Sequence, residues 1–107
     1  MAEKQMRTRC YYTDYVNHMI RFYLSTPDSL TMEGKRKADV DNWLAVQEIL
    51  RRMNDDDRRV LTTVFKKHHR VSEGVRIYCE EMGADTYKTW VIITKASQAI
   101  AKRRGLI

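Results

Sequence analysis

The sequence predicts an all-α protein of about five helices. Three observations favour this class. The 107 residues include only four glycines and one proline, too few breakers for the many turns of a β-protein. Hydrophobic residues make up 43% of the chain and are spread evenly, as in a folded globule. Apolar residues recur at spacings of three and four in five separate runs, as they do along one face of a helix.

The length suits a single domain, residues 1–107. Within it we distinguish an N-terminal aromatic helix and turn, residues 1–34, from a helix-turn-helix part, residues 35–107. No stretch is long and apolar enough for a membrane span, and no secretory signal is visible. We therefore expect a cytoplasmic protein with no membrane partner. Cys10 and Cys79 are expected to be reduced structural thiols.

The first helix is expected within residues 8–25. Its helically spaced apolar residues are Tyr12, Val16, Met19, Ile20 and Tyr23. Tyr11, Tyr15 and Phe22 widen this apolar arc, so the helix is either central to the core or shared with a partner as a homodimer contact. Pro27 follows and marks a turn or a helix start.

The second and third helices are expected within residues 35–53 and 54–67. The broad apolar arc of the second comprises Val40, Trp43, Leu44, Val46, Leu50 and Met53. Asn54 or Asp55 can cap the third helix, and the acidic residues that follow meet the positive end of its dipole. The third helix is the most clearly amphipathic of the five.

The fourth and fifth helices are expected within residues 71–82 and 85–107. Gly83 is a suitable end for the fourth helix, Asp85 a suitable N-cap for the fifth, and Gly105 a suitable end for the fifth. One side of the fifth helix carries Trp90, Ile93, Ser97, Ile100 and Ala101. We expect this side, with Trp90 as an anchor, to pack on the core.

No residue pattern indicates catalysis. The chain has no glycine-rich phosphate loop, no nucleophile elbow and no zinc-protease motif. The adjacent His68 and His69 have no further ligand at a metal-binding spacing, and Asp55–Asp57 are better explained as a helix start. We therefore expect no enzyme activity, no cofactor and no metal.

The charge and the last corner of the chain favour nucleic acid. The net charge of +6 and the pI of about 9.5 suit a polyanionic partner. A short glycine-containing turn joins the last two helices, as in a helix-turn-helix, whose second helix (here about 86–104) enters the major groove of double-stranded DNA. Candidate phosphate contacts are Lys88, Lys95, Lys102 and Arg103. Candidate base contacts are Thr86, Tyr87 and Thr89.

The stretches VQEILRRMNDDDRRVLTTVF, CEEMGADTYKTW and AIAKRRGLI carry a family resemblance. From Trp43 to Ile107 the chain resembles the sigma factor region 4-like regulators of phages and prophages, of the ArpU and RinA type. The matching helix-turn-helix positions are Cys79, Met82, Gly83, Asp85, Thr86, Tyr87 and Trp90. The resemblance implies a DNA-binding transcription regulator, and some relatives of region 4 also touch RNA polymerase.

Two other hypotheses about the function are consistent with the sequence. The chain is alternatively a helical protein–protein interaction module without nucleic-acid binding, using its aromatic first helix as the contact. It is alternatively a small DNA-packaging (terminase small) subunit of a phage, which would also carry a helix-turn-helix but would form a ring. The mass in solution separates a ring from a monomer or dimer.

Overall fold

Helices account for most of the chain that the structure describes. The computed structural model describes residues 12–26, 34–67 and 70–107, and no strand occurs among them. The helices are α2 (Thr13–Ser25), α3 (Lys37–Arg52), α4 (Asp55–Lys67), α5 (Val71–Met82) and α6 (Thr86–Arg103). Each falls within one of the five runs that the sequence predicts to be helical, so the all-α class is confirmed.

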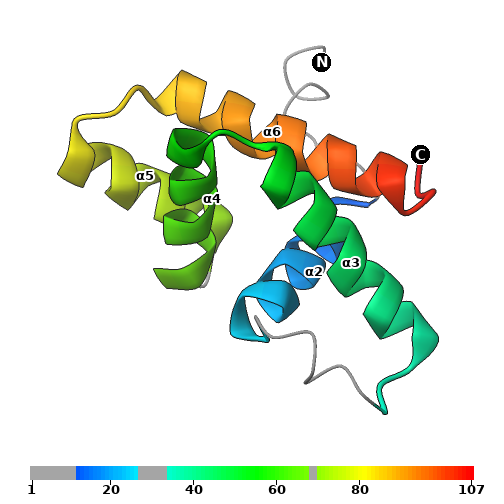
Figure 1. Cartoon of the computed structure of the whole chain (residues 1–107). Coiled ribbons are helices and arrows are strands. Elements are labelled where there is room, and N and C mark those ends of the chain that lie inside the picture. The colour runs from blue at the N-terminus through cyan, green and yellow to red at the C-terminus, as the bar shows by residue number, and fades with distance from the viewer. Residues whose placement is uncertain (1–11, 27–33, 68–69) are drawn as a thin grey trace.

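The last helix, α6, organises the fold. It runs along one side of the molecule, with α4 and α5 beneath its N-terminal half and α2 and α3 beneath its C-terminal half (Figure 1). It packs against all four other described helices. Those four helices lie on one side of α6, and none of them covers its opposite side, which we call the outward side (Figure 1). A helix in this position must be apolar on one side only.

One hydrophobic core draws on all five helices. The largest completely buried side chains are Trp43, Met19, Ile20, Leu61, Ile100, Val16, Val46, Val64 and Val75. From α6 the buried residues are Thr89, Ile93, Ala96, Ser97, Ile100 and Ala101. These positions recur at spacings of three and four, so they form a single stripe. The shared core agrees with a single domain.

The aromatic first helix belongs mainly to this core. Val16, Met19 and Ile20 of α2 are buried, and α2 packs against α3, α4 and α6. The ring centroids of Trp43 and Tyr23 lie 5.0 Å apart in a tilted arrangement. The indole N–H of Trp43 donates to the backbone oxygen of Thr26. The core role expected for α2 is therefore confirmed for its described residues. A homodimer contact through this helix stays a prediction.

The expected boundaries and caps agree with the structure at the α3–α4 junction. Met53 leaves α3 in an extended conformation, and the Asn54 side chain accepts the Asp57 backbone N–H at 2.8 Å. Asn54 is thus the cap of α4. The arc predicted for α3 was too broad, because Leu44 is exposed. The stripe through Trp43, Val46 and Leu50 turns Leu44 out of the core.

No helix in the described ranges is long and apolar enough to cross a membrane. Cys79 is buried and forms no disulfide. Cys10, Pro27, His68 and His69 lie outside the described residues. Among the residues that are described, no group of His, Cys, Asp or Glu side chains is arranged to hold a metal ion.

Candidate nucleic-acid interface

The corner between α5 and α6 is fixed by glycine geometry. Gly83 follows α5 with a φ of 64°, in the left-handed region that L side chains rarely adopt. The Gly83 and Ala84 backbone N–H groups donate to the Cys79 carbonyl oxygen, the latter at 3.1 Å. This C-cap satisfies a carbonyl at the end of α5 and reverses the chain. Only residues 83–85 therefore separate the two helices.

Asp85 starts α6 as the sequence predicts. Its carboxylate accepts the backbone N–H groups of Tyr87 at 2.8 Å and Lys88 at 3.2 Å. An acidic N-cap both fills these unpaired donors and meets the positive end of the helix dipole. The cap fixes where the helix begins, and therefore which residues of its first turn face outward. Thr86, Tyr87 and Lys88 are exposed there.

Thr89 is not on the outward side, contrary to its candidate role as a base contact. It is only 3% exposed. Its hydroxyl donates to the Asp85 carbonyl at 2.9 Å and accepts from the Cys79 thiol at 3.4 Å, so its polar atom is satisfied inside the protein. The buried Ile93 lies four positions after Thr89, which places both on one stripe. A side chain in this position has no path to a base.

The expected anchor, Trp90, is 36% exposed and lies at the edge of that stripe. One residue along a helix turns the side chain by about 100°, and Thr89, four positions before the buried Ile93, is the one of the two that points at the core. Thr89 and Ile93 hold this end of the helix instead. Trp90 joins Met82 and Tyr87, which are 66% and 75% exposed, as large apolar side chains in solvent near the corner.

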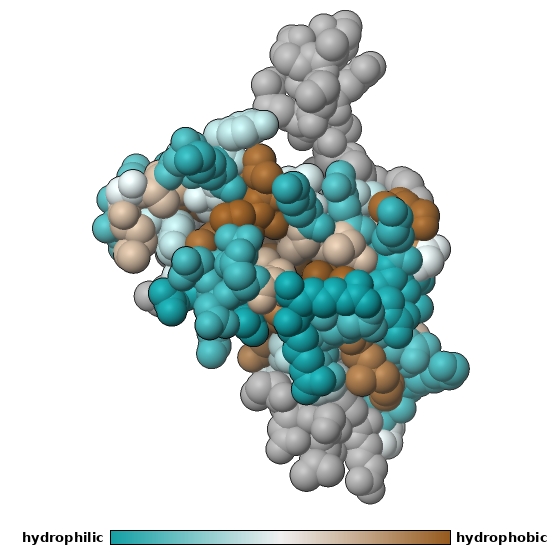
Figure 2. Space-filling model, turned by 45° about the horizontal axis from the view of Figure 1, so that its top comes forward, coloured by the Kyte–Doolittle hydropathy of each residue, from teal (hydrophilic) through white to brown (hydrophobic). Residues whose placement is uncertain are grey.

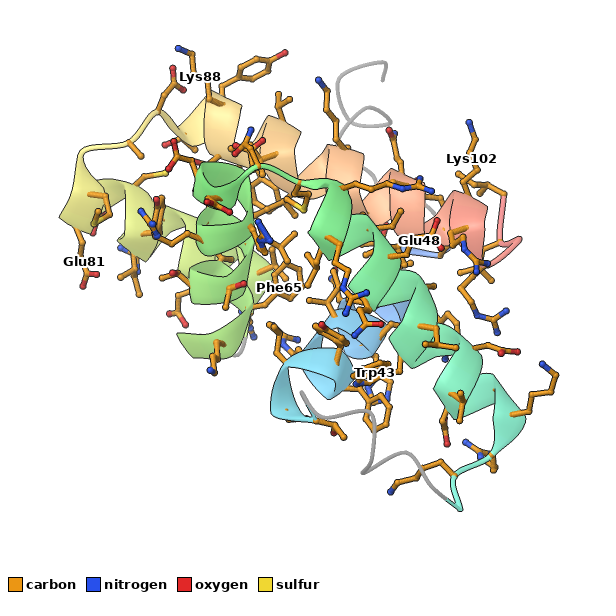
Figure 3. All side chains as sticks on the ribbon, in the orientation of Figure 1. Trp43, Glu48, Phe65, Glu81, Lys88 and Lys102 are labelled. Carbon is orange, nitrogen blue, oxygen red and sulfur yellow. The ribbon has the colours of Figure 1, made fainter. Side chains whose placement is uncertain are left out.

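Three lysines form a stripe along the outward side of α6. We call Lys88, Lys95 and Lys102 the lysine stripe; all three are exposed. A spacing of seven residues drifts by only about 20° around the helix, so they stay in line. Figure 3 shows Lys88 and Lys102 both projecting away from the other helices. Within the described residues none of the three forms an ion pair, and the stripe spans about 21 Å.

Arg103, the fourth candidate phosphate contact, is already paired. Its Nε donates to Glu48 Oε1 at 2.7 Å, and the second oxygen of Glu48 accepts from Arg52. The hydrogen bond from Arg103, followed by the charges of Arg103 and Arg52, lowers the pKa of Glu48 below its usual value. The same hydrogen bond raises the pKa of Arg103. Arg103 therefore lies in a cluster with α3 and is separate from the lysine stripe.

Arg104 also ties α6 to the rest of the fold. Its Nε donates to Asn42 Oδ1 at 2.6 Å, and the Asn42 amide donates to the Tyr15 hydroxyl at 2.9 Å. This chain of hydrogen bonds joins α6, α3 and α2. Gly105, with a φ of 75°, and the Leu106 N–H bonded to the Ala101 carbonyl at 2.8 Å then end the helix.

The two helices of the corner differ in charge. From Thr86 to the end of the chain there are five basic residues and no acidic one, whereas α5 carries three glutamates and one arginine. Glu81 projects from the side of the corner opposite to Lys88 (Figure 3). Glu80 is paired with Arg76 at 3.2 Å. The acidic residues before the turn therefore leave the lysine side of α6 positive.

Sequence reasoning missed the arginines of α3. Arg51 and Arg52 line a hollow together with Glu48 of the same helix and with Arg103, which is far away in the sequence. The doublet at the end of α3 and the Glu48–Arg52 spacing of four were visible signals of a charged cluster. Only the packing of α6 on α3 brings Arg103 into it.

Comparisons of the chain with protein-family models, with curated proteins and with solved structures give no match. The resemblance to sigma region 4-like regulators therefore stays a prediction.

Proposed function

We propose that this protein binds double-stranded DNA and acts on transcription, with α5 and α6 serving as a helix-turn-helix. The observation that carries the proposal is the lysine stripe: three exposed lysines in line on the outward side of a helix whose other side is buried. No acidic residue on α6 opposes them.

The geometry of the corner suits the division of labour in a helix-turn-helix. In that motif the second helix packs on the domain by one face and presents its N-terminal residues to base edges in the major groove. Here Thr89 and Ile93 hold α6 to the core, while Thr86 and Tyr87 stand exposed in its first turn. We assign base contacts to Thr86 and Tyr87 only, because Thr89 is buried.

The electrostatics suit a phosphate backbone. A lysine ammonium that neutralises a phosphate releases condensed counterions, and this supplies much of the affinity for DNA. The stripe is about 21 Å long, comparable to about six base-pair steps along a strand. Contacts spread over that length orient the helix relative to the duplex without reading sequence. The lysine stripe is therefore assigned to phosphates.

We assign the proposed DNA binding to transcription because residues 43–107 resemble the sigma region 4-like regulators of phage type. The exposed positions Gly83, Asp85, Thr86 and Tyr87 belong to the matching stretch. RNA polymerase is then a second partner to test once DNA binding is measured. A cytoplasmic location follows from the same role.

The direct test is a salt titration of binding to a short labelled duplex. A triple variant, Lys88→Gln, Lys95→Gln and Lys102→Gln, is compared with a control that loses the same charge elsewhere, Lys35→Gln, Arg59→Gln and Lys66→Gln. The control residues are exposed and unpaired within the described part of the chain. We expect the stripe variant to lose affinity on the order of a hundredfold and to flatten the salt slope by about 2.7.

Binding that is absent in the unmodified protein, or indifferent to salt, contradicts the proposal. Equal losses in the stripe variant and the control show that net charge alone attracts DNA and that α6 is not the interface. Selection of bound sequences from random duplexes then tests base reading. A Thr86→Ala variant is expected to relax the selected motif if that side chain contacts a base.

A second candidate, a protein-interaction module, is supported by a different observation. Met82, Tyr87 and Trp90 expose apolar side chains close to the corner. Replacing Met82 and Trp90 with serine removes much of this apolar surface and leaves the lysine stripe unchanged. If that change abolishes self-association or partner capture while the stripe variant has no effect on any binding, the interaction module is the better account.

A further inference from the structure

A groove between α3 and α6 is lined by more basic than acidic side chains. Its lining residues are Leu44, Gln47, Glu48, Arg51, Arg52 and Arg103. We call this hollow, in which three arginines surround Glu48, the arginine groove. It is open to solvent, with a volume of about 420 Å³. A water molecule occupies about 30 Å³ in the liquid, so the groove has room for a hydrated phosphate group.

The hydrogen bonding of Glu48 leaves most arginine donors unused. One carboxylate oxygen accepts from Arg103 and the other from Arg52. Each guanidinium has five N–H donors, so both arginines retain several. Arg51 forms no hydrogen bond or ion pair with any residue in the described ranges. The groove thus presents forked donors that match the oxygens of a phosphate.

A third arginine is not required for an ion-pair cluster whose role is only to stabilise the fold. Exposed pairs such as Glu48–Arg52 contribute little to folding, and an additional arginine beside two others adds repulsion. Three guanidinium groups around one carboxylate leave a local excess of two positive charges. Such an excess is relieved when an anion enters.

The position of the groove indicates which anion. Arg103 directly follows Lys102, so the groove adjoins the C-terminal end of the lysine stripe. In Figure 2 hydrophilic side chains form a dense group on the face that includes α6. A single polyanion lying along α6 can therefore reach both the stripe and the groove. A short acidic peptide in the groove would leave Lys88 and Lys95 without a role.

We propose that the arginine groove receives a phosphate of the DNA backbone beside the lysine stripe, and that Glu48 limits how tightly it does so. This inference rests on the proposed function. Arg51 is the free donor that makes the first contact. Glu48 holds Arg52 and Arg103 in place but competes with the incoming phosphate for their N–H groups. The groove thereby adds a contact from α3, outside the helix-turn-helix.

The test uses the same short duplex and the full chain. Arg51→Ala is compared with Arg59→Ala, which removes an exposed and unpaired arginine of α4. We expect Arg51→Ala to lower affinity about fivefold and to reduce the salt slope by about one, and Arg59→Ala to change neither. Glu48→Gln is expected to raise affinity about threefold, because it removes the competing charge. Thermal melting verifies that each variant is folded.

The outcomes separate this inference from the proposed function. If the lysine-stripe variant loses binding while Arg51→Ala matches Arg59→Ala, the groove proposal is wrong and DNA binding stands. A Glu48→Gln variant that binds no better, although folded, also overturns the groove proposal. A polyglutamate peptide serves as an alternative probe. If Arg51→Ala loses the peptide and keeps the duplex, the groove binds an acidic protein segment instead of DNA.

Discussion

At the N-terminal end of α6, Lys88 is exposed and has no acidic partner among the described residues, whereas at the C-terminal end Arg103 bonds to Glu48 and Arg104 bonds to Asn42. Both ends carry basic residues in the sequence, one at the first and three at the second. Their partners make the difference, because α3 passes under the second end only (Figure 1). Positive charge on one helix therefore divides into groups that hold the fold and groups free to meet a ligand.

The two ends share one buried stripe, so the largest expected effect comes from its centre. Ile100 is completely buried. We expect Ile100→Ala to lower the free energy of unfolding by about 2–5 kcal/mol, since it removes apolar contacts and leaves a cavity. Urea denaturation measures this. Ile107→Ala, at an exposed position, is the matched control and is expected to cost under about 0.5 kcal/mol. Similar losses in both variants contradict the assigned core.

The structural role of the C-terminal end is tested by Arg104→Ala. The change leaves the buried Asn42 oxygen without the donor that now lies 2.6 Å away. We expect a loss of about 1–2 kcal/mol in the free energy of unfolding. Arg59→Ala loses the same charge at an exposed, unpaired site and is expected to have little effect on stability. Equal stability of the two variants would remove the distinction between the ends of α6.

The N-terminal end is held by its cap, and Asp85→Ala tests this. Two backbone N–H groups lose their acceptor, and we expect a cost of about 1 kcal/mol. Asp85→Asn keeps the acceptor and removes the charge, so it is expected to recover most of the stability. Thermal unfolding followed by circular dichroism compares the three proteins. If Asn is as costly as Ala, the carboxylate charge and not its hydrogen bonds is what matters.

The smallest expected effect concerns acid. The pKa of Glu48 is lowered by its hydrogen bond from Arg103 and by the charges of Arg103 and Arg52, and Arg51 faces the same groove. A carboxyl with a lowered pKa in the folded state stabilises it above the unfolded pKa of about 4.3, and this contribution disappears as the pH falls through the folded pKa.

Glu48→Gln is therefore expected to be slightly less stable than the unmodified protein near neutral pH and to approach it below about pH 4. Urea titrations at several pH values measure the difference. Because Glu48 is solvated, we expect the effect to be modest. A stability difference that does not change with pH would show that the ionised carboxylate of Glu48 does not stabilise this end of α6.

Some features of the candidate site could be predicted from the sequence, whereas others depend on how the helices pack. The exposed position of the three stripe lysines, the Gly83 turn and the Asp85 cap were predicted correctly, because they depend on residues close together in the sequence. The positions expected for Thr89 and Trp90 were wrong: Thr89 is buried and Trp90 is partly exposed. Either residue could face the core of a helical protein, and only the helices packed against α6 show which one does. The pairing of Arg103 joins residues 55 positions apart, so no local pattern revealed it.

The sequence by itself determined the five helices and their ends, because helix periodicity, caps and the scarcity of glycine act over a few residues. It also determined that the last helix carries basic residues and no acidic ones. Only the tertiary structure decided which of these charges are free. Burial and ion pairing depend on what lies opposite each side chain, and α6 has four different helices opposite its buried side and none of them on its outer side.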